Sequence, residues 1–183
     1  SQRARAARLP TPTPAITDAQ LVSGALVPPT EAQCFAIGRR CFTASAMQNS
    51  YNLPPLYAAG NEGQGVTIAI IDSFGDPNMA SDLANFNTQM GLPHMCGEAD
   101  HTCAAGDPTF THVYWNGQTQ VKSPPPKSQG TGLQERDGWI VETALDVEWA
   151  HAMAPKANIL NVTTNVAETQ GVQGLPAMMQ AEQ

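Results

Sequence analysis

The spacing of hydrophobic and polar positions along the chain predicts a short series of helices and strands. Residues 66–72 are β-branched and apolar on both faces up to the last residue, which is typical of a central parallel strand. Residues 157–162 form a second apolar strand of the same kind. Helices are predicted within residues 43–59, where prolines interrupt the helix, and over residues 79–90, 139–153 and 168–183.

The order strand, helix, strand indicates a βαβ core. We therefore expect an α/β protein with a doubly wound parallel sheet and helices on both of its faces. Because no later strand follows, the segment 157–162 is expected to lie at an open edge of the sheet. Residues 1–33, rich in Arg, Ala, Pro and Thr, are expected to form an extended linker or tail, and residues 34–183 the folded part. The long stretch 91–137 has no regular pattern and is expected to be irregular.

Charge is distributed unevenly along the chain. The formal net charge is −7, but residues 41–183 contain four basic and fourteen acidic side chains, which gives this part −10. A nucleic-acid surface needs clustered Lys and Arg, so nucleic acid is excluded as a partner. When acid neutralises the carboxylates, the remaining positive charges repel one another, and this part of the chain has few of them. The composition therefore favours an acidic working environment. Ordinary compositional drift is the alternative explanation of the same counts. The longest apolar run, 66–71, is too short to span a membrane, and no membrane partner is expected.

The chain has four cysteines in two pairs of identical C-x6-C spacing, Cys34 with Cys41 and Cys96 with Cys103. The even count and the local pairing predict two small disulfides and an oxidising, extracytoplasmic compartment. A zinc site built from His94, His101 and the second cysteine pair is the alternative, but the usual C-x2-4-C spacing is absent. Residues 1–15 lack the apolar segment of a signal peptide, so we expect a processed or truncated part of a secreted protein.

The predicted helix 139–153 carries two carboxylates in an apolar setting. Glu142 and Asp146 lie one turn apart on a stripe that they share with Trp139 and Trp149. Like charges at this spacing cost a helix about 0.2–0.5 kcal/mol in water, and more beside apolar walls. A pair that shares a proton could act as a general base or proton store in acid. A solvated acidic face is the alternative, but the opposite side of the helix is also apolar, so we expect the helix to be buried all round.

Asp72 supplies a third carboxylate, at the carboxyl end of the first strand. Open α/β sheets place ligand-binding and catalytic groups at this edge. The same residue could instead cap a helix or form a turn. Asp72, Glu142 and Asp146 are the candidate catalytic residues, and no cofactor or metal is expected in this chain.

The residues around Glu142 resemble the E-x3-D helix of the sedolisins, which are serine-carboxyl peptidases with a subtilisin-like fold. The resemblance covers roughly residues 34–175, with several blocks in the family's order: 51–54, 65–72, 92–93 before the second cysteine loop, and 142–157. It implies a subtilisin-like doubly wound sheet of which only the amino-terminal half is present. It also implies a Ser-Glu-Asp triad that cleaves peptide bonds in acid. Glu142 would be the general base for the serine, Asp146 its supporting carboxylate, and Asp72 an extension of this network found in some members.

The chain departs from the sedolisin pattern in what it lacks. The family's serine lies in a Gly-Thr-Ser type of motif, which does not occur in this sequence, and the oxyanion-hole Asp and the calcium site should follow beyond Gln183. The long prodomain of the family is also missing in front. The resemblance therefore implies part of a secreted, acid-acting endopeptidase whose serine lies on a missing or separate carboxyl-terminal chain. That chain and a protein or peptide substrate are the expected partners, and this chain alone is expected to be inactive.

A second hypothesis belongs to a different class of function. The chain could be a non-catalytic secreted binding module, or an inactive fragment of the same fold. The carboxylates would then be retained structure, and residues 91–137 would contact a partner. In the resembling family the specificity pockets draw on strands that come later in the sequence.

Overall fold

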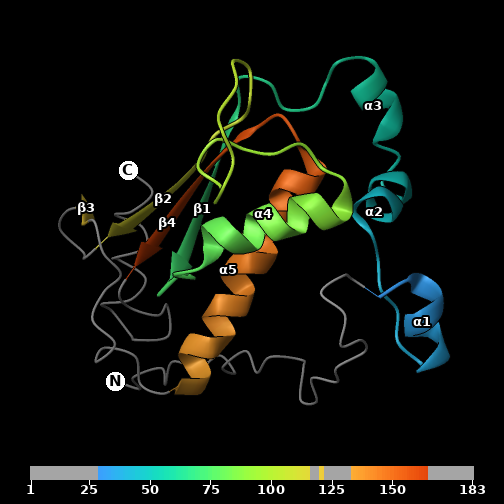
Figure 1. Cartoon of the computed structure of the whole chain (residues 1–183), viewed down its shortest axis with the longest axis horizontal. Helices are drawn as coiled ribbons and strands as arrows, with labels where there is room; N and C mark the ends of the chain where they lie inside the picture. Colours follow the sequence, from blue (N-terminus) through green and yellow to red (C-terminus); the bar gives the residue numbers. More distant parts are fainter. Residues whose placement is uncertain (1–28, 116–119, 122–132, 165–183) are drawn as a thin grey trace, which may run out of the picture.

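The computed structural model describes residues 29–115, 120–121 and 133–164 (Figure 1). The predicted helix 168–183 and the greater part of the predicted linker 1–33 lie outside the described residues. The elements in chain order are α1 (Glu31–Ala36), α2 (Ala44–Ser50), α3 (Pro54–Ala58), β1 (Thr67–Ser73), α4 (Met79–Met90), β2 (Phe110–Trp115), β3 (Gln120–Val121), α5 (Leu133–Met153) and β4 (Asn158–Thr164).

One mixed sheet organises the described part of the chain. Its strand order is β1-β4-β2-β3. β4 pairs in parallel with β1 on one side and with β2 on the other, and the short β3 pairs antiparallel with β2. The protein is thus a mixed α/β structure with three parallel strands, as the βαβ pattern predicts in outline.

The hydrophobic core lies between one face of this sheet and the two long helices. Ile159 and Phe110 stand opposite each other on β4 and β2, and they pack with Leu83 of α4 and Val147 of α5. Figure 1 shows α4 and α5 on the same side of the sheet. Thr67 and Ala69, on the other face of β1, are exposed. The described residues therefore place the long helices on one face of the sheet, where the sequence pattern predicts helices on both.

The position of β1 differs from the prediction. Among the described residues β1 pairs with β4 alone and lies at the edge of the sheet, although its apolar composition predicts a central strand. β4, predicted at an open edge, is the strand with two parallel neighbours. The prediction failed because β2 comes from the stretch 91–137, which lacks a simple period, and β2 covers the side of β4 that was expected to be free.

Local chemistry explains where the shorter helices begin and end. The Thr43 hydroxyl accepts the Ala46 N–H at 3.1 Å and caps α2. Pro54 then stands in the first turn of α3, where its missing N–H costs nothing, which explains the predicted break between the two helices. α4 has the predicted bounds and ends at Gly91, whose φ of 67° is left-handed.

Side chains from the amino-terminal helices hold the end of α5. Gln48 of α2 donates from Nε2 to the Ala152 carbonyl at 2.7 Å. The Tyr57 hydroxyl of α3 donates to the Met153 carbonyl at 2.8 Å. Because the last carbonyls of a helix have no partner within it, these two contacts satisfy two of them before the chain turns into β4.

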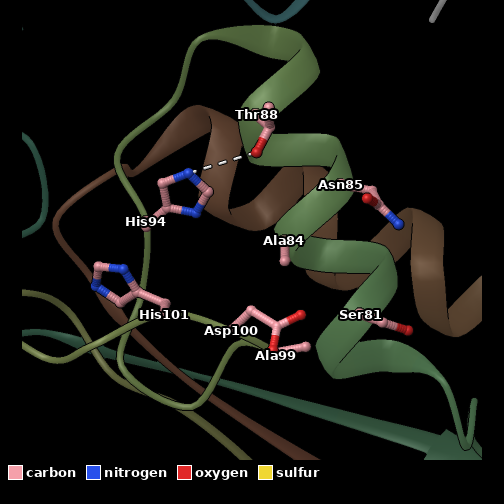
Figure 2. Close-up of a pocket in the computed structure, with 8 residues that line it drawn as sticks. All are labelled: Ser81, Ala84, Asn85, Thr88, His94, Ala99, Asp100 and His101. Atoms are coloured by element: carbon pink, nitrogen blue, oxygen red, sulfur yellow. Dashed lines mark hydrogen bonds between the residues drawn. The ribbon is translucent and has the colours of Figure 1, made fainter. Parts of the chain in front are cut away.

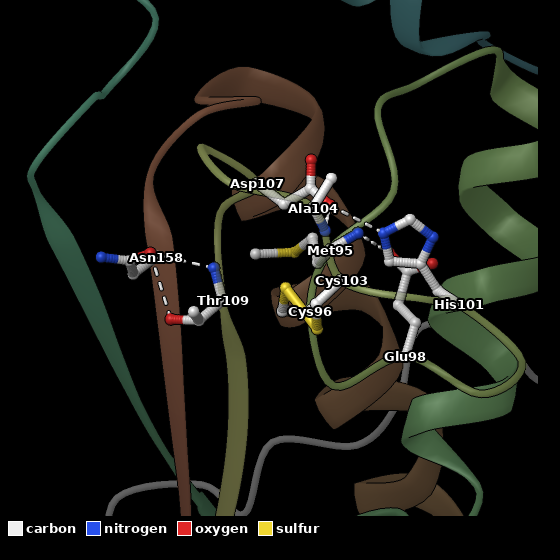
Figure 3. The surroundings of a disulfide bond; sticks show 9 residues. All are labelled: Met95, Cys96, Glu98, His101, Cys103, Ala104, Asp107, Thr109 and Asn158. Atoms are coloured by element: carbon white, nitrogen blue, oxygen red, sulfur yellow. Dashed lines mark hydrogen bonds and ion pairs between the residues drawn. A yellow bond between two sulfur atoms is a disulfide. The ribbon is translucent and has the colours of Figure 1, made fainter.

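The cysteines are joined as their spacing predicts, Cys34 to Cys41 and Cys96 to Cys103, with Cα atoms 5.8 Å and 4.9 Å apart. Figure 3 shows the second disulfide between β2 and the loop that carries His101. Cys96 also forms an isolated parallel bridge with Thr109, and its carbonyl accepts the Phe110 N–H at 2.7 Å. The loop therefore adds to the sheet just before β2 begins.

Gly97 is required at this junction for steric reasons. Its φ is +104°, and a Cβ built there would lie 2.1 Å from the Phe110 carbonyl oxygen. We expect Gly97→Ala to lower the free energy of unfolding by at least about 1 kcal/mol more than Gly106→Ala does. Gly106 has a similar φ of +98° but open space around it, so it controls for backbone strain alone. Thermal unfolding of the two variants measures the difference, and equal losses would contradict the steric argument.

Candidate functional site

Asp72 stands near the carboxyl end of β1, on the face that the helices cover. In the parallel register it lies opposite Thr163 of β4. The residue is only 2% exposed, and its Oδ2 accepts a hydrogen bond from Nδ2 of Asn161 at 2.8 Å. A buried carboxyl needs such a partner, so β4 holds the Asp72 side chain in a fixed position beneath α5.

α5 has one buried face and one face in solvent. Thr143 and Val147 are fully buried against the sheet, whereas Val141 and Leu145 are 58% and 47% exposed. Glu142 is exposed and Asp146 is half-buried. The prediction that this helix is buried all round is therefore wrong, because Val141, Glu142 and Leu145 remain exposed among the described residues.

Electrostatics connect the three predicted carboxyls into one group, here called the Asp72 cluster (Asp72, Glu142 and Asp146). Burial raises the pKa of Asp72 to about 6; the Asn161 hydrogen bond opposes this rise, and repulsion from Asp146 and, more weakly, Glu142 adds to it. Burial also raises the pKa of Asp146, with a further rise from Glu142. The structure thus brings the three candidate residues close enough to act on one another. In weak acid such a group can accept or hold a proton.

Three polar groups beside this cluster do not figure in the sequence prediction. They are Asn161, Thr143 of α5, which also opposes the rise in the Asp72 pKa, and His112 of β2, whose Nε2 lies 3.2 Å from the Thr163 hydroxyl. Burial lowers the pKa of His112 to about 4, so the ring is neutral above that pH. Asn161 could have been found from the sequence, because it is the single amide in the apolar run 159–162.

A second acidic group, separate from the Asp72 cluster, lies where α5 faces α4. Asp76 is fully buried in the turn after β1, and its Oδ1 accepts the Asn78 N–H at 2.8 Å. Burial raises the pKa of Asp76 to about 6; the Asn78 N–H opposes this, and neighbouring Asp82 of α4 adds to it. Burial raises the pKa of Glu148 to about 7, with repulsion from Asp82 and Asp76. α5 therefore contributes carboxyls to two separate groups.

The zinc alternative loses two of its ligands, because Cys96 and Cys103 form a disulfide. Its two histidines are each bound to a carboxylate: Nδ1 of His94 lies 2.6 Å from Glu98, and Nε2 of His101 lies 3.0 Å from Asp107. Across the described ranges, no three His, Cys, Asp or Glu side chains are arranged to hold a metal ion. No residue of this chain is assigned to the calcium site that the resemblance implies.

No family model, curated protein or solved structure matches the chain. The two disulfides indicate an extracytoplasmic protein. Within the part of the chain that the structure describes, no helix is long and apolar enough to cross a membrane. The function must therefore be inferred from the residues of the chain itself.

The raised pKa of Asp72 predicts a pH-dependent stability. The folded-state pKa of about 6 lies above the ordinary value of an unfolded carboxyl, so Asp72 stabilises the fold most below about pH 4, and this contribution is lost as the pH rises through 6. We expect Asp72→Asn to raise the Tm at pH 7 by a few degrees and to change it little at pH 4, since about 1 kcal/mol shifts the Tm of a chain of this size by ~2–4 °C.

Asp107→Asn is the matched control for this effect. The Ala104 N–H, together with His101, holds the pKa of Asp107 below its ordinary value, so its contribution is present at neutral pH and is lost in acid. This variant should not raise the Tm at pH 7. Thermal melts of both variants at pH 4 and pH 7 make the comparison. If Asp72→Asn has the same Tm as the unmodified chain at pH 7, the claim that an ionised, buried Asp72 destabilises the fold is wrong.

Proposed function

We propose that the chain is the amino-terminal part of a secreted, acid-acting serine-carboxyl endopeptidase of the sedolisin type, with the subtilisin-like fold of that family. The Asp72 cluster is the observation that carries this proposal. It joins the E-x3-D motif of α5 to a buried carboxyl at the carboxyl edge of parallel strands. Carboxyls with a shifted pKa are found more often at functional sites than elsewhere in a protein, and the carboxyl edge of a parallel sheet is a common place for such sites.

The burial of the three side chains is graded in a way that suits their proposed roles. Glu142 is exposed, Asp146 is half-buried and Asp72 is 2% exposed. Glu142 is therefore the member that a nucleophile from another part of the protein could reach. Asp146 stands behind it and Asp72 ends the series, held by Asn161.

The proposed reaction is acyl transfer from a peptide to a serine. As the serine oxygen attacks the peptide carbonyl carbon, its hydroxyl proton moves to the Glu142 carboxylate, and the electron pair of the carbonyl moves to the carbonyl oxygen. A carboxylate can serve as this base in acid, where a histidine would already be protonated. At pH 4–5 Asp72, with its pKa of about 6, keeps its proton and adds no negative charge beside Asp146.

The serine and the donors for the oxyanion would come from a carboxyl-terminal polypeptide, on a separate chain or lost from this one. The edge position of β1 is compatible with this arrangement. Among the described residues the strand pairs on one side only, Val66 before it is 54% exposed, and its residues are mostly apolar. An open edge of this kind can accept a further strand.

If the chain were a non-catalytic binding module, the Asp72 cluster would have no role. Holding Asp72 at a pKa of about 6 lowers the stability of the fold at neutral pH. A purely structural position could carry Asn, whose side-chain oxygen can still accept from Asn161, without this cost. We therefore favour the peptidase, in which the same carboxyls take part in proton transfer.

The first test compares two glutamates of the same helix in the complete, two-part enzyme. Glu142→Gln should lower kcat at acid pH by at least about a hundredfold, the usual effect of losing a general base. Glu148→Gln is the matched control, because Glu148 lies on α5 in the group with Asp76 and Asp82. It should retain most of the activity. Full activity of Glu142→Gln would remove Glu142 from the role of base.

The second test concerns the chain alone. Purified chain assayed at pH 3–5 on a denatured protein should release no peptides, because nucleophile and oxyanion donors are needed together with the base. Cleavage should appear when a carboxyl-terminal polypeptide with the Gly-Thr-Ser type of motif is added. Serine-dependent cleavage by the chain alone would show that the nucleophile has been placed wrongly.

A further inference from the structure

A cavity of about 430 Å³ lies between α4 and the loop that carries the second disulfide, away from the Asp72 cluster. Figure 2 shows Ser81, Asn85 and Thr88 on one wall, from α4, and His94, Asp100 and His101 on the other. Among the residues that the structure describes, the lining contains no Lys or Arg. The cavity is thus polar, and the side chains that surround it come from two elements that are fixed to each other.

Hydrogen bonds to carboxylates fix which nitrogen of each histidine carries a proton. A carboxylate only accepts, so the His94 ring donates from Nδ1 to Glu98 at 2.6 Å, and the His101 ring donates from Nε2 to Asp107 at 3.0 Å. Nε2 of His94 lies 3.5 Å from the Thr88 hydroxyl, on the cavity side. The two carboxylates therefore hold both rings in place in the cavity wall.

Negative charge surrounds these two rings, which stack with their centroids 5.4 Å apart. Asp100 lines the cavity with an exposed carboxylate. Glu98 lies behind His94 and accepts N–H groups from Asn87 at 2.5 Å and Met95 at 2.8 Å. Asp107 lies behind His101, and the Ala104 N–H holds its pKa below the ordinary value. A polar cavity with one carboxylate on its lining and two more behind its histidines favours a cationic ligand.

The loop is held in place without any ligand. The disulfide Cys96–Cys103 closes it, and the Ala99 N–H donates to the Ala80 carbonyl of α4 at 3.0 Å. Asp100 has a φ of +59°, in the left-handed region, which Asp and Asn adopt more readily than other residues except glycine. A site fixed in advance loses less entropy on binding than a mobile loop does.

We propose that this cavity binds the guanidinium or ammonium group of an arginine or lysine side chain from a second polypeptide. A metal ion is disfavoured, since no three ligating side chains are arranged around one point in the described ranges. A cavity of about 430 Å³ has room for a long basic side chain. The inference does not rest on the peptidase proposal, because none of these residues belongs to the Asp72 cluster.

The test uses two pentapeptides that differ in charge alone. Acetyl-Gly-Gly-Arg-Gly-Gly-amide and its citrulline counterpart have nearly the same shape, but citrulline is neutral. Each is titrated at pH 7 into the full chain while the ring signals of His94 and His101 are followed by NMR. The arginine peptide should shift both rings and bind at least tenfold more tightly than the citrulline peptide.

Two variants locate the binding. Asp100→Asn removes the carboxylate that lines the cavity, and asparagine tolerates the positive φ, so the loop should remain folded. The dissociation constant should rise about tenfold in this variant and stay unchanged in Glu31→Gln, which removes an exposed charge on α1. Equal binding of the two peptides, or binding that Asp100→Asn leaves intact, would overturn the proposal. A shift of the same rings by Zn²⁺ but not by the arginine peptide would also overturn it in favour of a metal.

Discussion

The hydrogen bond between Asn161 and Asp72 fixes the geometry on which the candidate site depends. It joins β4 to β1 across 89 positions of sequence, and both side chains are buried. Successive residues of a strand point to opposite faces, so a shift of one residue would turn Asp72 away from α5. The polar pair makes such a shift costly, because a buried carboxyl and a buried amide would each lose a partner. The register of the sheet and the composition of the acidic cluster are therefore set by the same contact.

The balance of buried titratable groups fits a protein that is more stable in acid than at neutral pH. Burial raises the pKa of Asp72, Asp76, Asp146 and Glu148, and each of these carboxyls favours the folded state when it is protonated. Burial lowers the pKa of His112 and His151, which act in the opposite direction. The carboxyls outnumber the histidines. The scarcity of Lys and Arg in residues 41–183 works to the same end, because little like charge accumulates when the carboxyls are neutral.

Local signals in the sequence predicted some of this structure and could not predict the rest. α4 could be placed to the residue, because its apolar spacing ends at a glycine that stops the helix. β2 was missed, although Phe110, Val113 and Tyr114 are good strand formers, because it follows a turn-rich loop and has no clear alternation. The edge position of β1 depends on which strand pairs beside it, and composition does not carry that information. For the site, the E-x3-D spacing placed Glu142 and Asp146 on one helix, whereas the exposure of Glu142 depends on how α5 rests on the sheet.

The contacts that close the end of α5 have a consequence for the speed of folding. Gln48 and Tyr57 reach carbonyls that are 104 and 96 residues away in sequence. The pairing of β1 with β4 spans a similar distance. A chain whose structure depends on such distant partners must close large loops before it gains their contacts, and this slows folding. α4 needs only its own sequence to form turns, while α5 gains its final hydrogen bonds once the amino-terminal helices have docked. A nascent chain therefore cannot complete this core until residue 164 has been synthesised. Until then, the segments that precede β4 remain partly folded.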